Sequence, residues 1–333
     1  MKKLTLAAGI VMLGAAAAQA QDYPWTPDKP ITIIVPWGAG GATDQVTRVT
    51  AGVLEDALGQ TVVVVNQPGA SGSIGKKNAF EAEHDGYTWA AGAPKQLGTY
   101  KLLGLWDTWI DDWRLYNTVT NVPLVAVNPD SPFQTMDDFI AAMEADDVTI
   151  ATAGAGSSGH AAAEALKGVV GGGYKHVTYD GGNPAVVATV AGEAQATTQL
   201  ASEQAEMVRG GRLRPLAVLA DQPLDIEGYG TVPAVTDFIE GDLPILSTAF
   251  GIFIPAEGTP PEVIETFDMI WADVIANSDA LKGYALEKGA LFTPASGDAA
   301  RERVWPEIQA DAWSFDAAGR TTMSPDELDI PKP

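Results

Sequence analysis

The residues of this chain that could do chemistry gather around two glycine-rich turns. One of them, ATAGAGSSGHAAAE at residues 151–164, contains the spacing G-x-G-x-x-G at Gly154, Gly156 and Gly159. Between a strand and a helix this spacing is typical of a dinucleotide-binding turn, and Asp180 lies where an acid that binds the ribose is expected. The same backbone N–H groups can instead hold a simple organic anion without any reaction.

This first turn also offers a nucleophile beside a base. Ser157 and Ser158 precede His160, and a serine next to a histidine can attack an ester or an amide. A secreted serine hydrolase is therefore the alternative function. No G-x-S-x-G elbow surrounds either serine, and none of the three histidines lies in a spacing such as H-E-x-x-H. We expect no catalytic residue and no metal, and His160 either donates to a ligand as a neutral ring or packs under the turn.

The second turn is VPWGAGGATD at residues 35–44. A strand-like run ends here, glycines follow, and a helix is expected to start at Thr43 and Asp44. The first N–H groups of a helix bind anions with little help from side chains. No Gly-Lys-Ser/Thr follows, so the turn is not a phosphate-binding P-loop. It is either an anion site or a plain tight turn capped by Thr43.

The N-terminus predicts export. Lys2 and Lys3 precede an apolar stretch, Leu4 to Ala18, and Ala18-Gln19-Ala20 is an A-x-A cleavage site. We therefore expect residues 1–20 to be a signal peptide and the mature chain to start at Gln21, in the periplasm. The chain has no cysteine, which excludes a lipid anchor and disulfides. No later stretch is apolar over the ~18 residues that a membrane span needs.

Export argues against the dinucleotide interpretation, because nicotinamide cofactors are scarce outside the cytoplasm. The turn at residues 154–159 also lies in the middle of the chain, whereas the dinucleotide fingerprint usually opens its fold. An equivalent glycine turn already exists at residues 38–41. We therefore expect no cofactor.

The charge balance excludes other partners. The formal charge is −23, or −25 once Lys2 and Lys3 are removed with the signal peptide. Such an acidic surface disfavours nucleic acid and anionic membranes as partners. It does not require a cationic ligand, because salt screens distant carboxylates over about 8 Å.

The sequence alternates between strand-like and helix-like stretches, which predicts an α/β fold with parallel pairing. The expected strands lie at 31–35, 61–66, 86–92, 123–132, 148–154, 176–182, 194–200 and 213–220, and a further strand is expected at the start of residues 247–278. The expected helices lie at 43–59, 135–146, 158–170, 184–193, 260–278 and 299–319. We expect two lobes, the first from residues 21–124 and 248–333 and the second from residues 125–247. The ligand is then expected in the crevice between them.

Local details are also predicted. Residues 95–121 read as a long irregular connection with short helices, in which Trp106, Trp109, Trp113 and Tyr116 pack rather than bind a ligand. Residues 230–238 read as a surface loop. Thr259 is expected to be the N-cap of the helix that follows, and the helix at 299–319 is expected to be interrupted near Pro306.

Six motifs together resemble the substrate-binding receptors of the tripartite tricarboxylate transporter family, also called the Bug family. They are YPWTPDKPITIIVPWGAGGATDQVTR, VVVVNQPGASGSIG, HDGYT, IATAGAGSSGHAAAE, YDGGNPAVVATVAGE and GRLRPLAVLA, in the order of the family. The resemblance extends over nearly the whole mature chain. It implies a type II periplasmic binding protein, with two α/β lobes that close by a hinge on a small carboxylate. It also implies docking on a small and a large membrane subunit, and we expect a monomer.

The resemblance further implies which residues bind the ligand. The matching positions in the turn of residues 35–44 are Trp37, Gly38, Ala39, Gly40, Gly41, Thr43 and Asp44. Gly156, Ser157, Ser158 and His160 are implied from the other lobe, and Tyr179 and Asp180 at a strand end.

Two positions depart from the family or add to it. The family usually has an acid in its G-x-V-D segment, where this chain has Gln195. This difference predicts either a changed ligand preference or a lost hinge contact. Lys95, in GAPKQLG, is expected near the cleft, and we hypothesise that it pairs with a second carboxylate of the ligand. The alternative is a solvated surface lysine.

Overall fold

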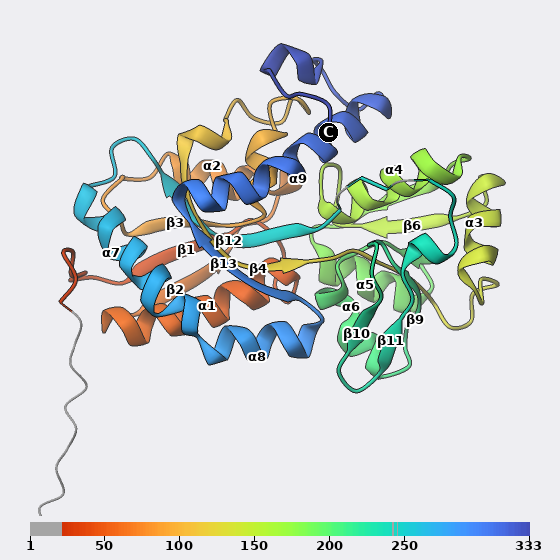
Figure 1. The fold of residues 1–333 in the computed structure, drawn as a ribbon, viewed down its shortest axis with the longest axis horizontal. Helices are drawn as coiled ribbons and strands as arrows, with labels where there is room; N and C mark the ends of the chain where they lie inside the picture. Colours follow the sequence, from red (N-terminus) through yellow and green to blue (C-terminus); the bar gives the residue numbers. More distant parts are fainter. Residues whose placement is uncertain (1–21, 242, 245) are drawn as a thin grey trace, which may run out of the picture.

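The computed structural model describes residues 22–241, 243–244 and 246–333. The predicted signal peptide lies outside these ranges. Two lobes lie side by side, and each is built around its own β-sheet (Figure 1). Both are mixed α/β layers, as expected from the alternation of strands and helices.

The first lobe contains a six-stranded sheet. Its strands are β1 (Ile31–Val35), β2 (Val62–Asn66), β3 (Thr88–Gly92), β4 (Trp113–Asn121), β12 (Thr248–Pro255) and β13 (Leu291–Ser296). The order across the sheet is β13-β4-β12-β3-β1-β2. β1 pairs in parallel with β2 and β3, as predicted, whereas β12 runs antiparallel to β3 and β4, and β13 runs antiparallel to β4.

The second lobe contains a five-stranded sheet and a small hairpin. The sheet strands are β5 (Leu124–Val127), β6 (Thr149–Thr152), β7 (Lys175–Thr178), β8 (Ala196–Thr197) and β9 (Arg214–Val218), in the order β7-β6-β8-β5-β9. β6 is parallel to β7 and β8, and β5 is antiparallel to β8 and β9. The hairpin consists of β10 (Leu224–Ile226) and β11 (Gly230–Val232). The prediction that residues 230–238 form a surface loop was wrong, because β11 lies there and Val232, Ala234 and Val235 are buried.

Helices cover both faces of each sheet. They are α1 (Ala42–Leu58), α2 (Ser73–Phe80), α3 (Met136–Glu144), α4 (Ser158–Val170), α5 (Gly182–Ala191), α6 (Ala201–Arg209), α7 (Pro261–Asp273), α8 (Asp279–Lys288) and α9 (Gly297–Ala317). Short 3₁₀ helices lie at Ala70–Gly72, Pro94–Gly98, Ile110–Asp112, Val235–Asp237, Ile275–Asn277 and Pro325–Leu328. In Figure 1, α9 and α2 lie above the first sheet, and α1 and α8 lie below it.

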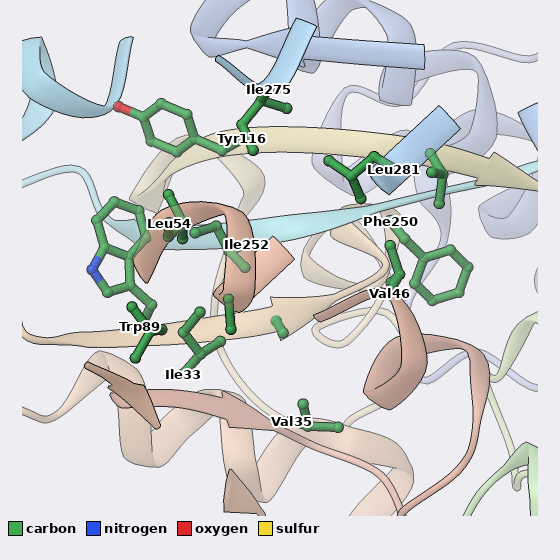
Figure 2. Close-up of a cluster of buried hydrophobic side chains, with 14 of the residues drawn as sticks. Ile33, Val35, Val46, Leu54, Trp89, Tyr116, Phe250, Ile252, Ile275 and Leu281 are labelled. Atoms are coloured by element: carbon green, nitrogen blue, oxygen red, sulfur yellow. The ribbon is translucent and has the colours of Figure 1, made fainter. Parts of the chain in front are cut away.

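The hydrophobic core of the first lobe lies on both faces of its β-sheet. One face, with Ile33, Trp89, Tyr116 and Ile252, packs against α1, α7 and α8 (Figure 2). The opposite face packs against α2 and α9. Because successive side chains of a strand point to opposite faces, strands buried on both sides show little alternation of polarity.

This burial explains the main error in the predicted elements. Residues 113–121 form β4, between β12 and β13 in the sheet, instead of part of an irregular connection. Eight of its nine residues are buried, so no polar face marks it as a strand. The prediction that Trp113 and Tyr116 are packing residues is confirmed, since both lie in the core.

Three other local predictions were wrong. Thr259 does not cap α7, because its hydroxyl donates to the carbonyl oxygen of Pro255 and Pro260 holds the N-cap position. The helix containing Pro306 is continuous, since Val304 and Ile308 on either side of it are anchored in the core. The strand expected at residues 194–200 is confined to β8, and α6 follows it.

Candidate functional site

A small cavity of about 30 Å³ lies between the two lobes. Its first-lobe wall includes Trp37 in the β1–α1 turn, Gln96 in a 3₁₀ helix and Phe250 in β12. Its second-lobe wall includes Gln199 and Glu203, from the start of α6. Room for a water molecule needs about 10–15 Å³, so an organic acid enters only if the lobes part or side chains move.

Among the described residues, four helix N-termini border this cavity, and that of α6 contributes Leu200 and the acidic Glu203. α1 contributes Gly41, Ala42 and Thr43, α4 contributes Ser157 and Ser158, and α5 contributes Gly182. The first N–H groups of a helix have no acceptor within the helix, and the helix dipole adds a partial positive charge there. Their convergence makes the cavity a site for a negatively charged group. The sequence predicted the contributions of α1 and α4 but not that of α5.

The β1–α1 turn is held in shape by Asp44. Gly40 adopts a φ of 82°, and its N–H donates to Asp44 Oδ2 at 2.9 Å. Arg48 and Asn66 also donate to this carboxylate, at 2.8 and 2.9 Å. Burial raises the pKa of Asp44, but these hydrogen bonds outweigh it and bring the pKa below its usual value. The ionised Asp44 carboxylate therefore stabilises the conformation of the turn through its hydrogen bond to the backbone of Gly40.

The other predicted residues of this turn lie in different places. Trp37, Gly41 and Thr43 line the cavity. Gly38 instead faces the second lobe, where its N–H donates to the carbonyl oxygen of Asp180 at 3.0 Å. Ala39 is exposed.

On the second lobe, the two predicted serines line the cavity and the histidine lies behind it. The Ser157 hydroxyl caps α4 by accepting the N–H of His160 at 3.2 Å. The Ser158 hydroxyl and the Thr248 hydroxyl are 3.0 Å apart, a contact with β12. The carbonyl oxygen of Gly156 accepts a hydrogen bond from the amide of Gln96, at 3.3 Å, which also joins the lobes.

The contacts of His160 do not form a nucleophile–base pair. Its Nδ1 accepts the N–H of Gly156 at 3.2 Å, and its Nε2 lies 3.3 Å from Glu164 Oε1. The ring stacks on His176, with centroids 4.5 Å apart. Within residues 22–241, 243–244 and 246–333, neither ring nitrogen contacts a serine hydroxyl. The geometry required for serine hydrolysis is therefore not assembled.

Neither Tyr179 nor Asp180, which were predicted to bind the ligand, is among the residues that line the cavity. Tyr179 donates its hydroxyl hydrogen to Glu193 at 3.1 Å. Asp180 contacts Gly38 through its backbone oxygen, and its side chain is exposed. Gln195, where the family usually has an acid, accepts the N–H of Thr149 at 2.8 Å and so stays within the second lobe.

Lys95 is buried, with 1% of its surface exposed. Its Nζ lies 3.0 Å from Asp311 Oδ2 of α9. Burial raises the pKa of Asp311, and the charge of Lys95 opposes that rise. Lys95 thus already has a carboxylate partner, and it is not among the residues that line the cavity.

Sequence reasoning missed Glu203, as well as Gln96, Gly182, Gln199 and Phe250, which also line the cavity. Glu203 Oε1 accepts the N–H of Ala42 at 3.0 Å, and Glu203 Oε2 accepts that of Leu200 at 3.3 Å. The side-chain amide of Gln199 can be oriented so that its nitrogen and its oxygen both make hydrogen bonds. In that orientation the nitrogen donates to Glu203 Oε2 at 2.9 Å, and the oxygen accepts the N–H of Ala153. Burial raises the pKa of Glu203 to about 7, although the two backbone N–H groups favour the ionised form. An acid at the third position of a helix is a helix-start signal, and this signal at Glu203 could have revealed α6.

The described residues contain neither a membrane-spanning helix nor a cluster of metal-binding side chains. No helix in this part of the chain is both long and apolar enough to cross a membrane. The same residues contain no group of three or more histidine or acidic side chains arranged to hold a metal ion.

Comparisons with known proteins agree with this arrangement. Residues 46–282 match the family described as tripartite tricarboxylate transporter family receptor (TctC). The chain is 31% identical over 317 residues to Protein BugT of Bordetella pertussis, covering 93% of this chain and 95% of BugT. It is similar in structure to the periplasmic binding protein BugD, with a TM-score of 0.78 at 21% identity over 89% of this chain and 99% of BugD. It is also similar to Rpa4515 of R. palustris with adipate, with a TM-score of 0.76 at 24% identity over 88% and 98% of the two chains.

Proposed function

The chain belongs to the tripartite tricarboxylate transporter family of receptors, and we propose that it binds a small organic carboxylate between its lobes and delivers it to the transporter. A solute receptor of this family is a periplasmic protein. The fold is that of a periplasmic binding protein, with a cavity between two α/β lobes. The delivery step requires docking of the closed form on a small and a large membrane subunit.

The observation that carries this proposal is the convergence of α1, α4 and α5 on one cavity. Glu203 already accepts the N–H of Ala42. A ligand anion beside it can accept the remaining N–H groups of the helix starts and is favoured by their dipoles, with no need for an arginine. Rpa4515, of the same fold, has been solved with adipate, which supports a carboxylate as the ligand class.

Binding is coupled to closure of the lobes. In the closed arrangement, Gly38 bonds to Asp180, Gln96 to Gly156, and Thr248 contacts Ser158. All three contacts join residues on opposite sides of the cavity. A ligand that touches both sides stabilises the closed state, because its affinity for that state exceeds its affinity for the open one.

The signal peptide predicted from the sequence supports the same function. We propose that residues 1–20 are removed during secretion and that the mature protein is a periplasmic monomer. N-terminal sequencing of protein from the periplasmic fraction should begin at Gln21, and size-exclusion chromatography should give the mass of one chain. A retained N-terminus would contradict the proposed processing.

The test of the main proposal is a thermal-shift screen of residues 21–333 against mono-, di- and tricarboxylates, aromatic acids and amino acids. A ligand that binds only the folded state raises the melting temperature by mass action. We expect at least one acid to raise it in a dose-dependent way, with binding confirmed by calorimetry. If no organic acid does so, the proposed function is wrong. Hydrolysis of an ester or amide panel that is lost in Ser158→Ala would instead favour the hydrolase.

A further inference from the structure

The charge on the cavity wall is opposite to what a site for a dianion needs. Among the described residues that line the cavity, Glu203 is the one with an ionisable side chain, and it is acidic. Lys95 is paired with Asp311, and Arg48 is paired with Asp44. The buried Lys76 lies behind Gln96, to which it donates a hydrogen bond, and it is not among the residues that line the cavity; burial lowers its pKa well below the usual range.

The position of Glu203 is built to hold a carboxylate. Its two oxygens accept backbone N–H groups from α1 and from the start of α6. A Cβ at Gly182, the first residue of α5, would overlap this carboxylate, and one at Gly41 would lie 3.2 Å from Oε1. Glycines at both helix starts therefore leave the space that Glu203 fills.

A carboxylate held beside the proposed ligand site repels a second bare carboxylate and attracts a cation. Burial raises the pKa of Glu203 to about 7 against the N–H groups of Ala42 and Leu200, which favour the ionised form, so Glu203 is mostly ionised at pH 8. The oxygens of a carboxylate have about four lone-pair sites, so a further donor can bind. Trp37 and Phe250 line the same cavity, and aromatic rings also attract cations.

Building on the proposed function, we infer that Glu203 determines specificity by accepting hydrogen bonds from an ammonium group of the ligand. The ligand class is then an amino acid, whose carboxylate binds the N–H groups of the helix starts and whose ammonium group pairs with Glu203. A dicarboxylate of the same length lacks the group that this side chain requires.

The test compares pairs of acids that differ by one ammonium group. The pairs are aspartate and succinate, glutamate and glutarate, and 2-aminoadipate and adipate. Affinities are measured by calorimetry at pH 8 for the wild type and Glu203→Gln. We expect the wild type to bind an amino member at least tenfold more tightly than its partner. We expect the ratio in Glu203→Gln to fall to about one or below, because a neutral amide attracts an ammonium group weakly and does not repel a carboxylate.

Two further variants separate the role of Glu203 from general charge and from folding. Gly182→Ala displaces the carboxylate without removing its charge, and Gly182 is not among the glycines with positive φ. We expect it to reduce the preference as well. Glu206→Gln removes the same charge from the exposed face of α6, where Glu206 pairs with Arg209 and Lys288. We expect it to leave the preference unchanged.

The inference and the proposed function fail in different ways. If no organic acid binds the wild type, the proposed function is wrong. If acids bind but the wild type prefers the unsubstituted member of each pair, the inference about Glu203 is wrong. It is equally wrong if Glu203→Gln keeps the wild-type ratio, or if Glu206→Gln changes the ratio as much as Glu203→Gln does.

Discussion

Gly38→Ala tests whether closure of the lobes is coupled to binding. Gly38 donates its N–H to the carbonyl oxygen of Asp180 across the cavity at 3.0 Å. A Cβ at Gly38 would lie 2.8 Å from that oxygen, whereas ordinary contact begins at 3.4 Å. The two loops would have to separate by about 0.6 Å, the difference between these distances. The backbone of Gly38 is not in the left-handed region, so alanine itself is tolerated.

The magnitude follows from the two contacts that change. A backbone hydrogen bond contributes about 0.5–1.5 kcal/mol, and overpacking a tight contact costs about 1–3 kcal/mol. The closed arrangement therefore loses at least about 1.5 kcal/mol, the sum of the two lower limits. The cores of both lobes are not affected. Because the ligand binds the closed state, we expect its affinity to fall about tenfold or more.

The assay is calorimetry with an acid that binds the wild type, together with small-angle X-ray scattering. Gly38→Ala should bind more weakly and give a larger radius of gyration, with an unchanged circular dichroism spectrum. Gly52→Ala is the matched control, because a Cβ at this position of α1 would meet nothing within 4 Å, and its affinity should equal that of the wild type. Wild-type affinity and wild-type scattering of Gly38→Ala would refute the proposed coupling.

The remaining predictions concern three other positions. Gly40→Val puts a branched side chain at a residue whose φ is 82°, with its Cβ 3.1 Å from Asn183 Nδ2. We expect ligand binding to be lost while the fold stays intact. Wild-type affinity, measured by calorimetry, would contradict the assignment of this turn to the ligand site. Lys95→Ala leaves Asp311 buried without its cation. Urea unfolding should therefore show that the free energy of unfolding falls by about 3–5 kcal/mol. An unchanged affinity for dicarboxylates would exclude pairing of Lys95 with the ligand. Burial raises the pKa of Glu164, but its polar and cationic neighbours bring it from the usual 4.5 to about 2. The ionised Glu164 carboxylate therefore contributes up to about 3 kcal/mol to the free energy of unfolding. This contribution is fully present above pH 4.5 and is lost as the pH falls towards 2. The stability difference between the wild type and Glu164→Gln should shrink over that range, and a constant difference would contradict this.

Local sequence signals predicted the elements that depend on local interactions. The helix of residues 135–146 was predicted from its cap, and in the structure the Thr135 hydroxyl accepts the N–H of Asp138 at 3.2 Å. The glycine predicted to end α1, Gly59, adopts the left-handed conformation at its C-cap. Both signals act over a few residues of the chain, so they can be read without the fold.

Elements that depend on distant partners were harder to predict. β4 lies between β12 and β13, which are far along the chain, and is buried on both faces, so its residues carry no alternation. The turn of residues 35–44 was recognised as a candidate anion site, but not its bond to Asp180, which depends on how the two lobes face one another.

The sequence alone determined the α/β alternation, the two glycine turns and the resemblance to a family of receptors, because each depends on residue types at short spacings. Only the tertiary structure decided that α5 joins α1 and α4 at one cavity. It also decided that Glu203, which is 161 residues from Ala42, completes that cavity with a carboxylate. Burial and charge at a site depend on the neighbours that packing supplies, and those neighbours are not neighbours in the sequence.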